Sequence, residues 1–143
     1  MAHALAQARA AGARGEVPIG AVLVDETGRI LAADGNRTRA LNDPTAHAEV
    51  LVIRAACAER ESERLPGCDL YVTLEPCPMC AAAISYARIR RLYYGATDPK
   101  GGGVDHGARV FAQATCHHVP DVYSGIAETE AAALLKAFFA NRR

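Results

Sequence analysis

Short apolar runs and longer amphipathic stretches alternate along this chain, and their spacing predicts its secondary structure. Apolar runs of strand length occupy residues 21–24, 30–33, 70–74 and 92–94, with a weaker one at 119–123. Glu26-Thr27-Gly28 separates the first two, which predicts an antiparallel hairpin. Apolar residues at helical spacing predict helices over residues 2–13, from near His47 to before Pro66, over 78–88 and over 128–142.

The order of these elements predicts an α/β fold. Helices separate the later strands, so the connections between those strands are crossovers, which produce parallel pairs. Together with the hairpin this predicts a mixed five-stranded sheet, mostly parallel, with helices on both faces in three α-β-α layers. Ligands in such sheets bind beyond the carboxyl ends of the strands. The 143 residues contain no internal repeat or linker, so we expect one domain, residues 1–143.

For two of these helices the sequence also predicts the residues that start the helix or line one of its faces. Asp43-Pro44-Thr45 supplies a capping side chain followed by a proline, which favours a helix start at this point. The residues predicted for the buried stripe of that helix are Ala46, Val50, Ile53 and Cys57. The residues predicted for one face of the last helix are Ala132, Leu135 and Phe139.

The candidate chemistry lies in His47-Ala48-Glu49 and in Pro76-Cys77-Pro78-Met79-Cys80. His47, Cys77 and Cys80 supply one imidazole and two thiolates, which is a ligand set typical of zinc. Three protein ligands leave the fourth tetrahedral position open, as in catalytic zinc sites. Zinc lowers the pKa of a water bound there to about 7, and Glu49 supplies a spare carboxylate that can move protons.

The spacing of these residues predicts a site where two helices begin. His47 and Glu49 are two apart, so they can serve one site only if it lies beyond the end of a helix. Cys77 and Cys80 are three apart and share a face, and Pro78 suits the first helical turn. Two helix N-termini would then converge on the metal, and their dipoles favour thiolate over thiol.

Two simpler interpretations of the cysteines stay open. A Cys-x-x-Cys pair also occurs in redox centres, although that use leaves His47 and Glu49 without a role. A closed structural zinc site needs a fourth ligand. The residues that could supply it are Cys57, Cys68, Cys116, His117 and His118. We favour the catalytic site because both halves of the pattern occur in the right order with suitable flanking residues.

Composition and charge narrow the class of protein. Half of the residues are hydrophobic and 22% are charged, as expected for a globular domain. No apolar run approaches the length needed to span a membrane. Sixteen basic and sixteen acidic residues balance, so net charge alone gives no argument for a nucleic-acid partner. Five cysteines, two of them assigned to a metal, indicate a reducing compartment, and we expect a cytoplasmic protein.

Several segments extend the two zinc motifs and carry a family resemblance. They are residues 16–22, 36–37, 43–49, 70–80, 94–102 and 134–139. Over nearly its whole length the chain resembles the cytidine deaminase-like superfamily, and within it the bacterial tRNA-specific adenosine deaminases. H-x-E followed by P-C-x-x-C is the signature of zinc nucleobase deaminases. Residues 98–102 and the paired phenylalanines of the last helix favour the tRNA enzymes.

The chain also departs from that family in places. Cys116-His117-His118 stands where the family often has Asn-His-Arg, so RNA contacts are not transferred to that stretch. Val104-Asp105-His106 replaces a Gly-Ser expected nearby. Family members usually begin some residues earlier with a longer first helix, which is consistent with Met1 being a late start or a truncation.

The resemblance implies the cytidine deaminase-like fold, a Zn²⁺ cofactor and hydrolytic conversion of adenosine to inosine at the wobble position of a tRNA anticodon loop. Zinc-bound hydroxide would attack the base, with Glu49 as the proton shuttle. Asn36 would hydrogen-bond the base or ribose, Asp98 would meet a ribose hydroxyl and Lys100 would approach a phosphate. Ala48 and Pro76, each beside a zinc ligand, would complete the substrate contacts.

The resemblance also implies partners: the anticodon stem-loop of tRNA and a second copy of the chain, with no membrane. The Ala-rich helix over 78–88 has small residues on more than one face, so one face can cover the sheet while another packs on a partner. Arg88, Arg90 and Arg91 would then lie at the rim of this interface or beside RNA. The alternative is that the small residues only pack against the sheet, and we favour the dimer.

Two other functions remain to be weighed against the tRNA enzyme. A small-molecule deaminase acting on guanine, cytosine or a nucleotide would use the same zinc motifs, although guanine deaminases generally lack the 98–102 segment. A zinc-stabilised RNA-binding module without catalysis would belong to a different class. Glu49 argues against that module, because a closed structural site has no use for an unligated carboxylate.

Overall fold

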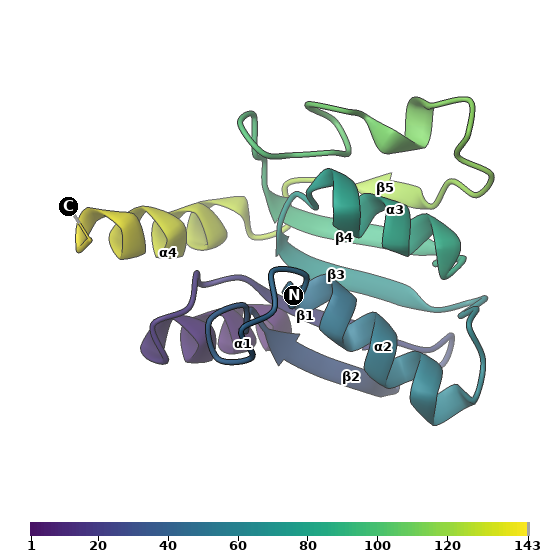
Figure 1. Cartoon of the computed structure of the whole chain (residues 1–143), viewed down its shortest axis with the longest axis horizontal. Helices are drawn as coiled ribbons and strands as arrows, with labels where there is room; N and C mark the ends of the chain where they lie inside the picture. The colour runs from purple at the N-terminus through teal and green to yellow at the C-terminus, as the bar shows by residue number, and fades with distance from the viewer. Residues whose placement is uncertain (143) are drawn as a thin grey trace.

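The computed structural model describes residues 1–142, and in this part of the chain five strands form one mixed sheet (Figure 1). In chain order the elements are α1 (Ala2–Ala13), β1 (Gly20–Val24), β2 (Ile30–Gly35), α2 (Ala48–Arg60), β3 (Asp69–Leu74), α3 (Pro78–Tyr86), β4 (Arg91–Ala96), the short η1 (Val110–Ala112), β5 (Asp121–Tyr123) and α4 (Glu128–Ala140). Each predicted helix and strand is therefore confirmed, whereas η1 was not predicted.

The strand order across the sheet is β2-β1-β3-β4-β5, and β1 alone runs opposite to the other strands. The crossovers behave as predicted, because α2 connects β2 to β3 and α3 connects β3 to β4, and these strands point the same way. The prediction of a mostly parallel sheet is nonetheless wrong. β1 lies between β2 and β3, so it forms an antiparallel pair on each side.

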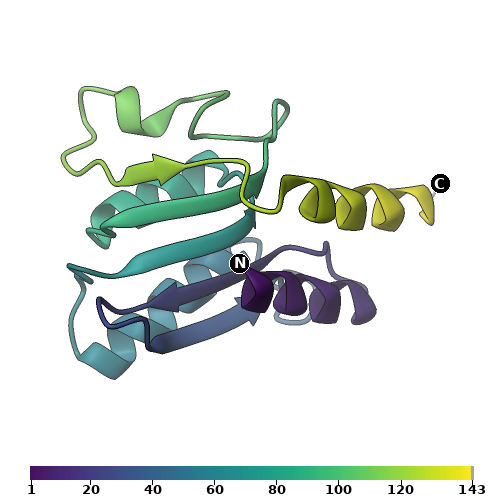
Figure 2. The ribbon, with the colours of Figure 1, turned by 180° about the vertical axis from the view of Figure 1, so that it is seen from behind.

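Helices cover both faces of the sheet, as predicted (Figures 1 and 2). α2 and α3 lie on one face, above the main hydrophobic core. Fully buried side chains of this core include Val52, Leu70, Ile84 and Leu92. On the other face α1 and α4 lie side by side, as Figure 2 shows, and a smaller cluster there contains Leu5, Ala96 and Ala131. Among residues 1–142, none of the helices has the length and apolar character needed to cross a membrane.

The helix α2 begins next to His47 as predicted, but Asp43 is not its capping residue, because the N-cap of this helix is His47 itself. Asp43 instead closes a turn of its own, in which its Oδ1 accepts hydrogen bonds from the backbone N–H and the hydroxyl of Thr45 at 2.8 and 2.7 Å. Asp and Asn side chains commonly form such turns two residues ahead. The capping signal was real, but it caps the turn that leads into the helix.

The buried faces of α2 and α4 differ in part from the predicted stripes. In α2, Val50 and Ile53 are buried as predicted, but the fully buried row is Ala48, Val52 and Ala56, and Cys57 is half-buried. In α4 the residue that faces the sheet is Ala131, whereas Ala132 and Phe139 are exposed. Ala131 can pack against β4 because the residue opposite it is Gly95. A Cβ on Gly95 would lie 3.0 Å from the Ala131 Cβ.

A pair of glycines lets α1 approach the sheet. Gly20 and Gly35 face each other across β1 and β2, and a Cβ on Gly20 would lie 2.0 Å from the carbonyl oxygen of Ala4 in α1. A Cβ on Gly35 would lie 2.7 Å from the carbonyl oxygen of Gln7. Both positions therefore require the absence of a side chain so that the α1 backbone can contact the strands.

We predict that Gly20→Ala destabilises the zinc-loaded protein by about 1–3 kcal/mol or more, because the added methyl group must displace the α1 backbone. Urea unfolding followed by circular dichroism measures this. Gly28→Asn is the matched control: Gly28 has a φ of +87°, which asparagine tolerates, and a Cβ there would meet nothing within 4 Å. Equal stability of the Gly20→Ala and wild-type proteins would contradict the close approach of α1.

Candidate metal centre and active site

Two helix N-termini meet at one end of the sheet, and their N-cap residues are His47 for α2 and Cys77 for α3. Both N-caps have extended backbone conformations, and neither side chain makes a capping hydrogen bond. Pro78 occupies the first turn of α3, as predicted, where the missing N–H has no cost. The two N-cap side chains are therefore free to point toward each other.

His47, Cys77 and Cys80 form a cluster whose candidate ligand atoms all lie within 4.8 Å of one another. The His47 Nδ1 is 3.6 Å from the Cys77 Sγ and 3.5 Å from the Cys80 Sγ. A tetrahedral zinc ion, with Zn–N about 2.0–2.1 Å and Zn–S about 2.3 Å, holds a nitrogen and a sulfur about 3.6 Å apart. The spacing of the side chains therefore fits zinc, and the cofactor prediction of Zn²⁺ is confirmed at the level of the ligand set.

Without a metal, the electrostatics of the cluster favour the metal-binding form of Cys77 alone. The hydrogen bond from the Cys80 thiol, aided by His47 and opposed by burial, lowers the pKa of Cys77 to about 4. The same interaction, together with burial, raises the pKa of Cys80. The hydrogen bond with Cys77 raises the pKa of His47. The three groups thus share protons that a bound cation would replace, because metals bind thiolate and neutral imidazole.

Glu49 lies in the first turn of α2 and is almost fully buried, at 4% exposed. Burial raises the pKa of its carboxyl group above the ordinary value, and the neighbouring Cys77 adds to this. Glu49 does not belong to the set of ligand atoms that lie within 4.8 Å of one another. The site therefore combines three ligands with a separate carboxyl group that holds a proton more readily than an exposed glutamate.

The five residues considered as a fourth ligand lie outside the cluster, within the described part of the chain. The Cys116 Sγ donates to the His118 carbonyl oxygen at 3.3 Å, and the His118 Nε2 is 2.7 Å from the Ile89 carbonyl oxygen. Cys68 is buried and its Sγ lies 3.9 Å from the Pro66 carbonyl oxygen. A closed structural site is therefore not supported by residues 1–142.

Asn36 follows β2 and is brought close to the start of α2, because the N–H of Arg37 donates to the Ala46 carbonyl oxygen at 3.0 Å. The Asn36 side chain is buried and oriented by a second residue. Its Nδ2 donates to Glu16 Oε2 at 3.3 Å, so the amide oxygen lies on the opposite side, away from Glu16. The structure thus brings Asn36 to the vicinity of His47 with a fixed amide orientation.

Asp98 and Lys100 lie in the loop after β4, at a surface groove of about 510 Å³ that Leu135 and Phe139 of α4 also line. Asp98 Oδ1 accepts the N–H groups of Lys100 and Gly101, at 3.2 and 2.9 Å. None of the three candidate zinc ligands lines this groove. The structure therefore places these two residues on a surface next to α4 and not in the ligand cluster itself.

Ala48 and Pro76 are both buried beside zinc ligands. The Ala48 side chain is part of the main hydrophobic core, so a substrate contact at this residue is left to its backbone N–H at the start of α2. The Pro76 carbonyl oxygen accepts the Gly103 N–H at 2.8 Å.

Two buried carboxylates near the site were missed by the sequence analysis. Glu16 is 2% exposed, and its Oε1 accepts the Ala40 N–H at 2.8 Å. Glu75 is also 2% exposed and directly follows β3. In both, burial would raise the pKa of the carboxyl, but hydrogen bonds from backbone N–H groups outweigh it and lower the pKa. A glutamate between a buried strand and the Pro76-Cys77 turn was the available signal for Glu75.

Comparison with known proteins agrees with the zinc site that the geometry indicates. The family model described as the cytidine and deoxycytidylate deaminase zinc-binding region matches residues 1–96, which include His47, Cys77 and Cys80. A relative from Agrobacterium fabrum (strain C58 / ATCC 33970), named tRNA-specific adenosine deaminase, is 68% identical over 143 residues, covering 100% of this chain and 93% of its own length.

Two solved structures have the same fold. One, from biochemical and structural studies of A-to-I editing by tRNA:A34 deaminases at the wobble position of transfer RNA, is 70% identical with a TM-score of 0.92, covering 94% of this chain and 97% of that one. A guanine deaminase from Nitrosomonas europaea is 25% identical with a TM-score of 0.82, covering 97% of this chain and 82% of that one. The predicted cytidine deaminase-like fold is therefore confirmed, and the chain belongs to the zinc-binding cytidine and deoxycytidylate deaminase family, among the tRNA-specific adenosine deaminases.

Proposed function

We propose that this chain converts adenosine to inosine at the wobble position of a tRNA anticodon loop. The observation that carries this proposal is the cluster of His47, Cys77 and Cys80 beside the buried Glu49, in a chain 68% identical over its full length to a tRNA-specific adenosine deaminase. The reaction consumes one water: a C–O bond forms at adenine C6, the C6–N6 bond breaks, and ammonia leaves.

The protein's own residues supply the proton transfers. Zinc held by His47, Cys77 and Cys80 would act as a Lewis acid, which lowers the pKa of a bound water to about 7. Glu49 takes a proton from the attacking water and delivers it to the adenine ring. It then moves a second proton to the departing amine. Its buried position suits both steps, because a carboxyl group with a raised pKa takes up and releases protons nearer neutral pH.

The remaining substrate residues act by position. Asn36 presents its amide oxygen to the base or ribose, since Glu16 holds its nitrogen. The Ala48 N–H and the Pro76 ring border the base. Asp98 meets a ribose hydroxyl, the group that distinguishes RNA from DNA, and the exposed Lys100 approaches a phosphate. A flipped-out nucleotide would reach the cluster while its neighbours lie in the groove beside α4.

A guanine deaminase is the alternative that shares the fold. The relationship to the guanine deaminase of Nitrosomonas europaea is distant, at 25% identity. The identity of 68% with a tRNA-specific enzyme, over the whole chain, supports the RNA substrate. The loop that contains Asp98 and Lys100 supports it too, because both lie on the surface next to α4 where a polymer has access.

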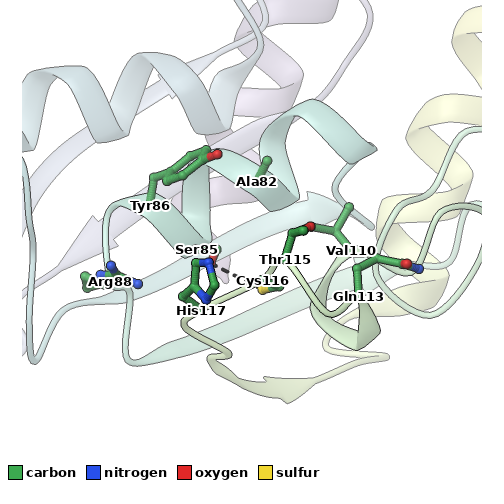
Figure 3. A pocket seen from close by; sticks show the side chains of 9 residues that line it. All are labelled: Ala82, Ser85, Tyr86, Arg88, Val110, Gln113, Thr115, Cys116 and His117. Atoms are coloured by element: carbon green, nitrogen blue, oxygen red, sulfur yellow. Dashed lines mark hydrogen bonds between the residues drawn. The ribbon is translucent and has the colours of Figure 1, made fainter.

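We also propose that the protein acts as a homodimer through the exposed side of α3, where a pocket of about 250 Å³ lies between α3 and the segment after η1 (Figure 3). Figure 3 shows Tyr86 and Ala82 on the α3 side of this pocket and Cys116 and His117 opposite them. Among the large hydrophobic residues of the described chain, Tyr86 is the most exposed, at 77%. A second copy with two-fold symmetry would cover it.

The proposed rim of this interface is smaller than the sequence suggested. Arg90 forms a two-pronged ion pair with the buried Asp69, at 2.9 and 2.8 Å, and Arg91 lies 3.9 Å from the same carboxylate. These two arginines therefore neutralise Asp69, and Arg88 is left to contact a partner or RNA from the edge of the pocket. We further propose that residues 1–143 form one domain and that the protein works in the cytoplasm, where its free thiols and a tRNA substrate belong.

Substitution of the metal ligands tests the zinc site. Cys77→Ala and His47→Ala each remove one of three ligands, so we expect zinc affinity to fall by about 100-fold or more and thermal stability to fall with it. Zinc content per chain by atomic absorption, together with thermal unfolding, measures both. Cys57→Ala, which changes a half-buried thiol outside the cluster, should keep full zinc content. Wild-type zinc content in both ligand variants would contradict the assignment of His47 and Cys77 as zinc ligands.

An activity assay tests the substrate and the proton transfer. The zinc-loaded protein should deaminate an adenosine in an anticodon stem-loop RNA, with no comparable activity on guanine or cytidine. Glu49→Gln should keep zinc and RNA binding while turnover falls by about 10²–10⁴-fold, because the proton shuttle is gone. Inosine formation followed by mass spectrometry measures both. Faster turnover of guanine than of RNA would contradict the proposed RNA substrate. Near wild-type turnover by Glu49→Gln would show that Glu49 is not the proton shuttle.

A substitution on α3 tests the proposed assembly. Tyr86→Lys places a charge on the exposed side of α3 without touching the core, so we expect it to convert the dimer to a monomer. Sedimentation equilibrium at micromolar concentration measures the mass against 15.1 kDa for one chain. Phe139→Lys, at an exposed aromatic residue on α4, is the matched control and should remain dimeric. A wild-type protein that sediments as an active monomer would rule out the dimer.

A further inference from the structure

The buried carboxylate of Glu75 gathers hydrogen bonds from both ends of the loop that follows β4. Its Oε1 accepts the Asp98 N–H at 3.0 Å. Its Oε2 accepts the N–H groups of Val104, Asp105 and His106 at 3.3, 3.0 and 3.1 Å. The Glu75 side chain is 0% exposed, so these donors are what replaces water around its charge.

A side chain of the loop completes this set. His106 Nδ1 lies 2.8 Å from Glu75 Oε1 and donates to it, so the imidazole contributes a fifth hydrogen bond. The His106 side chain is itself 38% exposed, so it covers the carboxylate from the solvent side. His106 belongs to the Val104-Asp105-His106 stretch in which the sequence departs from its family, and neither the zinc ligands nor the proposed RNA contacts use it.

The neighbours of His106 fix the same stretch from the protein interior. Val104 is buried in the main hydrophobic core, and Asp105 accepts a hydrogen bond from the hydroxyl of Tyr94, a fully buried residue of β4. Val104, Asp105 and His106 therefore each make a separate attachment: to the core, to β4 and to Glu75. The loop is held at its far end by three consecutive residues.

Glycines bring the loop into contact with the metal-ligand turn. Gly103 donates its N–H to the Pro76 carbonyl oxygen at 2.8 Å, and a Cβ on Gly103 would lie 2.5 Å from the Pro78 nitrogen. A Cβ on Gly102 would lie 2.5 Å from Glu75 Oε2. The loop backbone thus lies directly against the turn that presents Cys77, with no room for a side chain between them.

We infer that Glu75 and His106 form a positioning pair, which holds the 98–106 loop closed against the Cys77 turn and so presents Asp98 and Lys100 to the RNA. The carboxylate ties the Asp98 end of the loop to its 104–106 end, and the imidazole of His106 covers the carboxylate. The consequence for catalysis rests on the proposed RNA contacts of Asp98 and Lys100, whereas the closed loop itself does not.

The identity of Glu75 matters because all five of its partners are donors. A carboxylate offers about four acceptor sites on two oxygens, which suits this environment. Glutamine has the same shape but turns one oxygen into an NH₂ group, which would face N–H groups on one side. Glu75→Gln should therefore loosen the loop while it keeps the volume of the side chain.

The test compares three variants at the pair with one control, all zinc-loaded. His106→Ala removes the imidazole donor, and His106→Asn restores a donor, because its Nδ2 reaches about where the imidazole Nδ1 lies. Glu75→Gln attacks the same interaction from the other side. His3→Ala changes an exposed histidine on α1 and is the matched control. Zinc content and thermal unfolding establish that each variant is folded and loaded.

Hydrogen exchange of the free protein tests the closed loop without any substrate. We expect the amides of Val104, Asp105 and His106 to exchange about tenfold faster or more in His106→Ala and in Glu75→Gln, with α2 unchanged. His106→Asn and His3→Ala should exchange at the wild-type rate. Unchanged exchange in His106→Ala, or failure of His106→Asn to restore protection, would overturn the positioning pair whatever the enzyme acts on.

Kinetics with the stem-loop RNA test the consequence. We expect KM to rise about tenfold or more in His106→Ala, with kcat changed by about twofold or less and with rescue by His106→Asn. In an Asp98→Ala background the His106→Ala change should have little further effect, because the loop no longer has its RNA contact to present. A loop that opens without a change in KM would overturn the role of the pair in RNA binding, and absence of RNA turnover in the wild type would instead contradict the proposed function.

Discussion

The start of two helices at the same end of one sheet is the constraint on which the rest of this structure depends. His47 and Cys77 are the N-caps of α2 and α3, and their side chains do not cap. Capping side chains typically stabilise a helix by about 1 kcal/mol. The two helices give up that contribution, and in exchange an imidazole and a thiol lie 3.6 Å apart at the positive ends of two helix dipoles. Zinc binding is the interaction that offsets the loss.

Loops around this centre are held by buried carboxylates. Glu16 orients Asn36 on the α2 side, and Glu75 organises the loop after β4 on the α3 side. Charges of this kind are costly to bury, and both are stabilised by backbone N–H groups more than by cations. A carboxylate that collects several N–H groups fixes the backbone of a whole loop, which an isolated salt bridge between side chains does not do. Each side of the zinc cluster therefore has one loop whose backbone is hydrogen-bonded to a buried carboxylate.

Sequence patterns predicted the elements and the ligand set because these depend on local spacing. The apolar runs predicted the strands. The start of α3 was predicted from Cys77 and Cys80, which are three residues apart with Pro78 between them. The position of β1 between β2 and β3 could not be predicted, because it depends on which strand edges meet after the crossover forms. The capping residue of α2 was misassigned because Asp43 caps a turn as effectively as it would cap a helix.

The same limit applies to charged residues near the site. From the sequence, Arg90 and Arg91 were expected at the rim of an interface or beside RNA. In the structure both form ion pairs with the buried Asp69, about twenty residues earlier in the chain. Glu75 lay in one of the segments that carry the family resemblance and was assigned no role of its own, although its side chain is completely buried. Long-range partners decide whether a charge faces water or organises a loop, and a single sequence does not contain them. The zinc ligands were easier because their chemistry restricts the possible partners.

The central claim is that three protein ligands hold zinc and leave one position for water. X-ray absorption spectroscopy at the zinc edge of the loaded protein tests it most directly. The account predicts two sulfurs at about 2.3 Å, one imidazole nitrogen at about 2.0–2.1 Å and one further oxygen from solvent. A third sulfur or a second imidazole around the zinc would contradict it, because the site would then be closed and without a place for the attacking water.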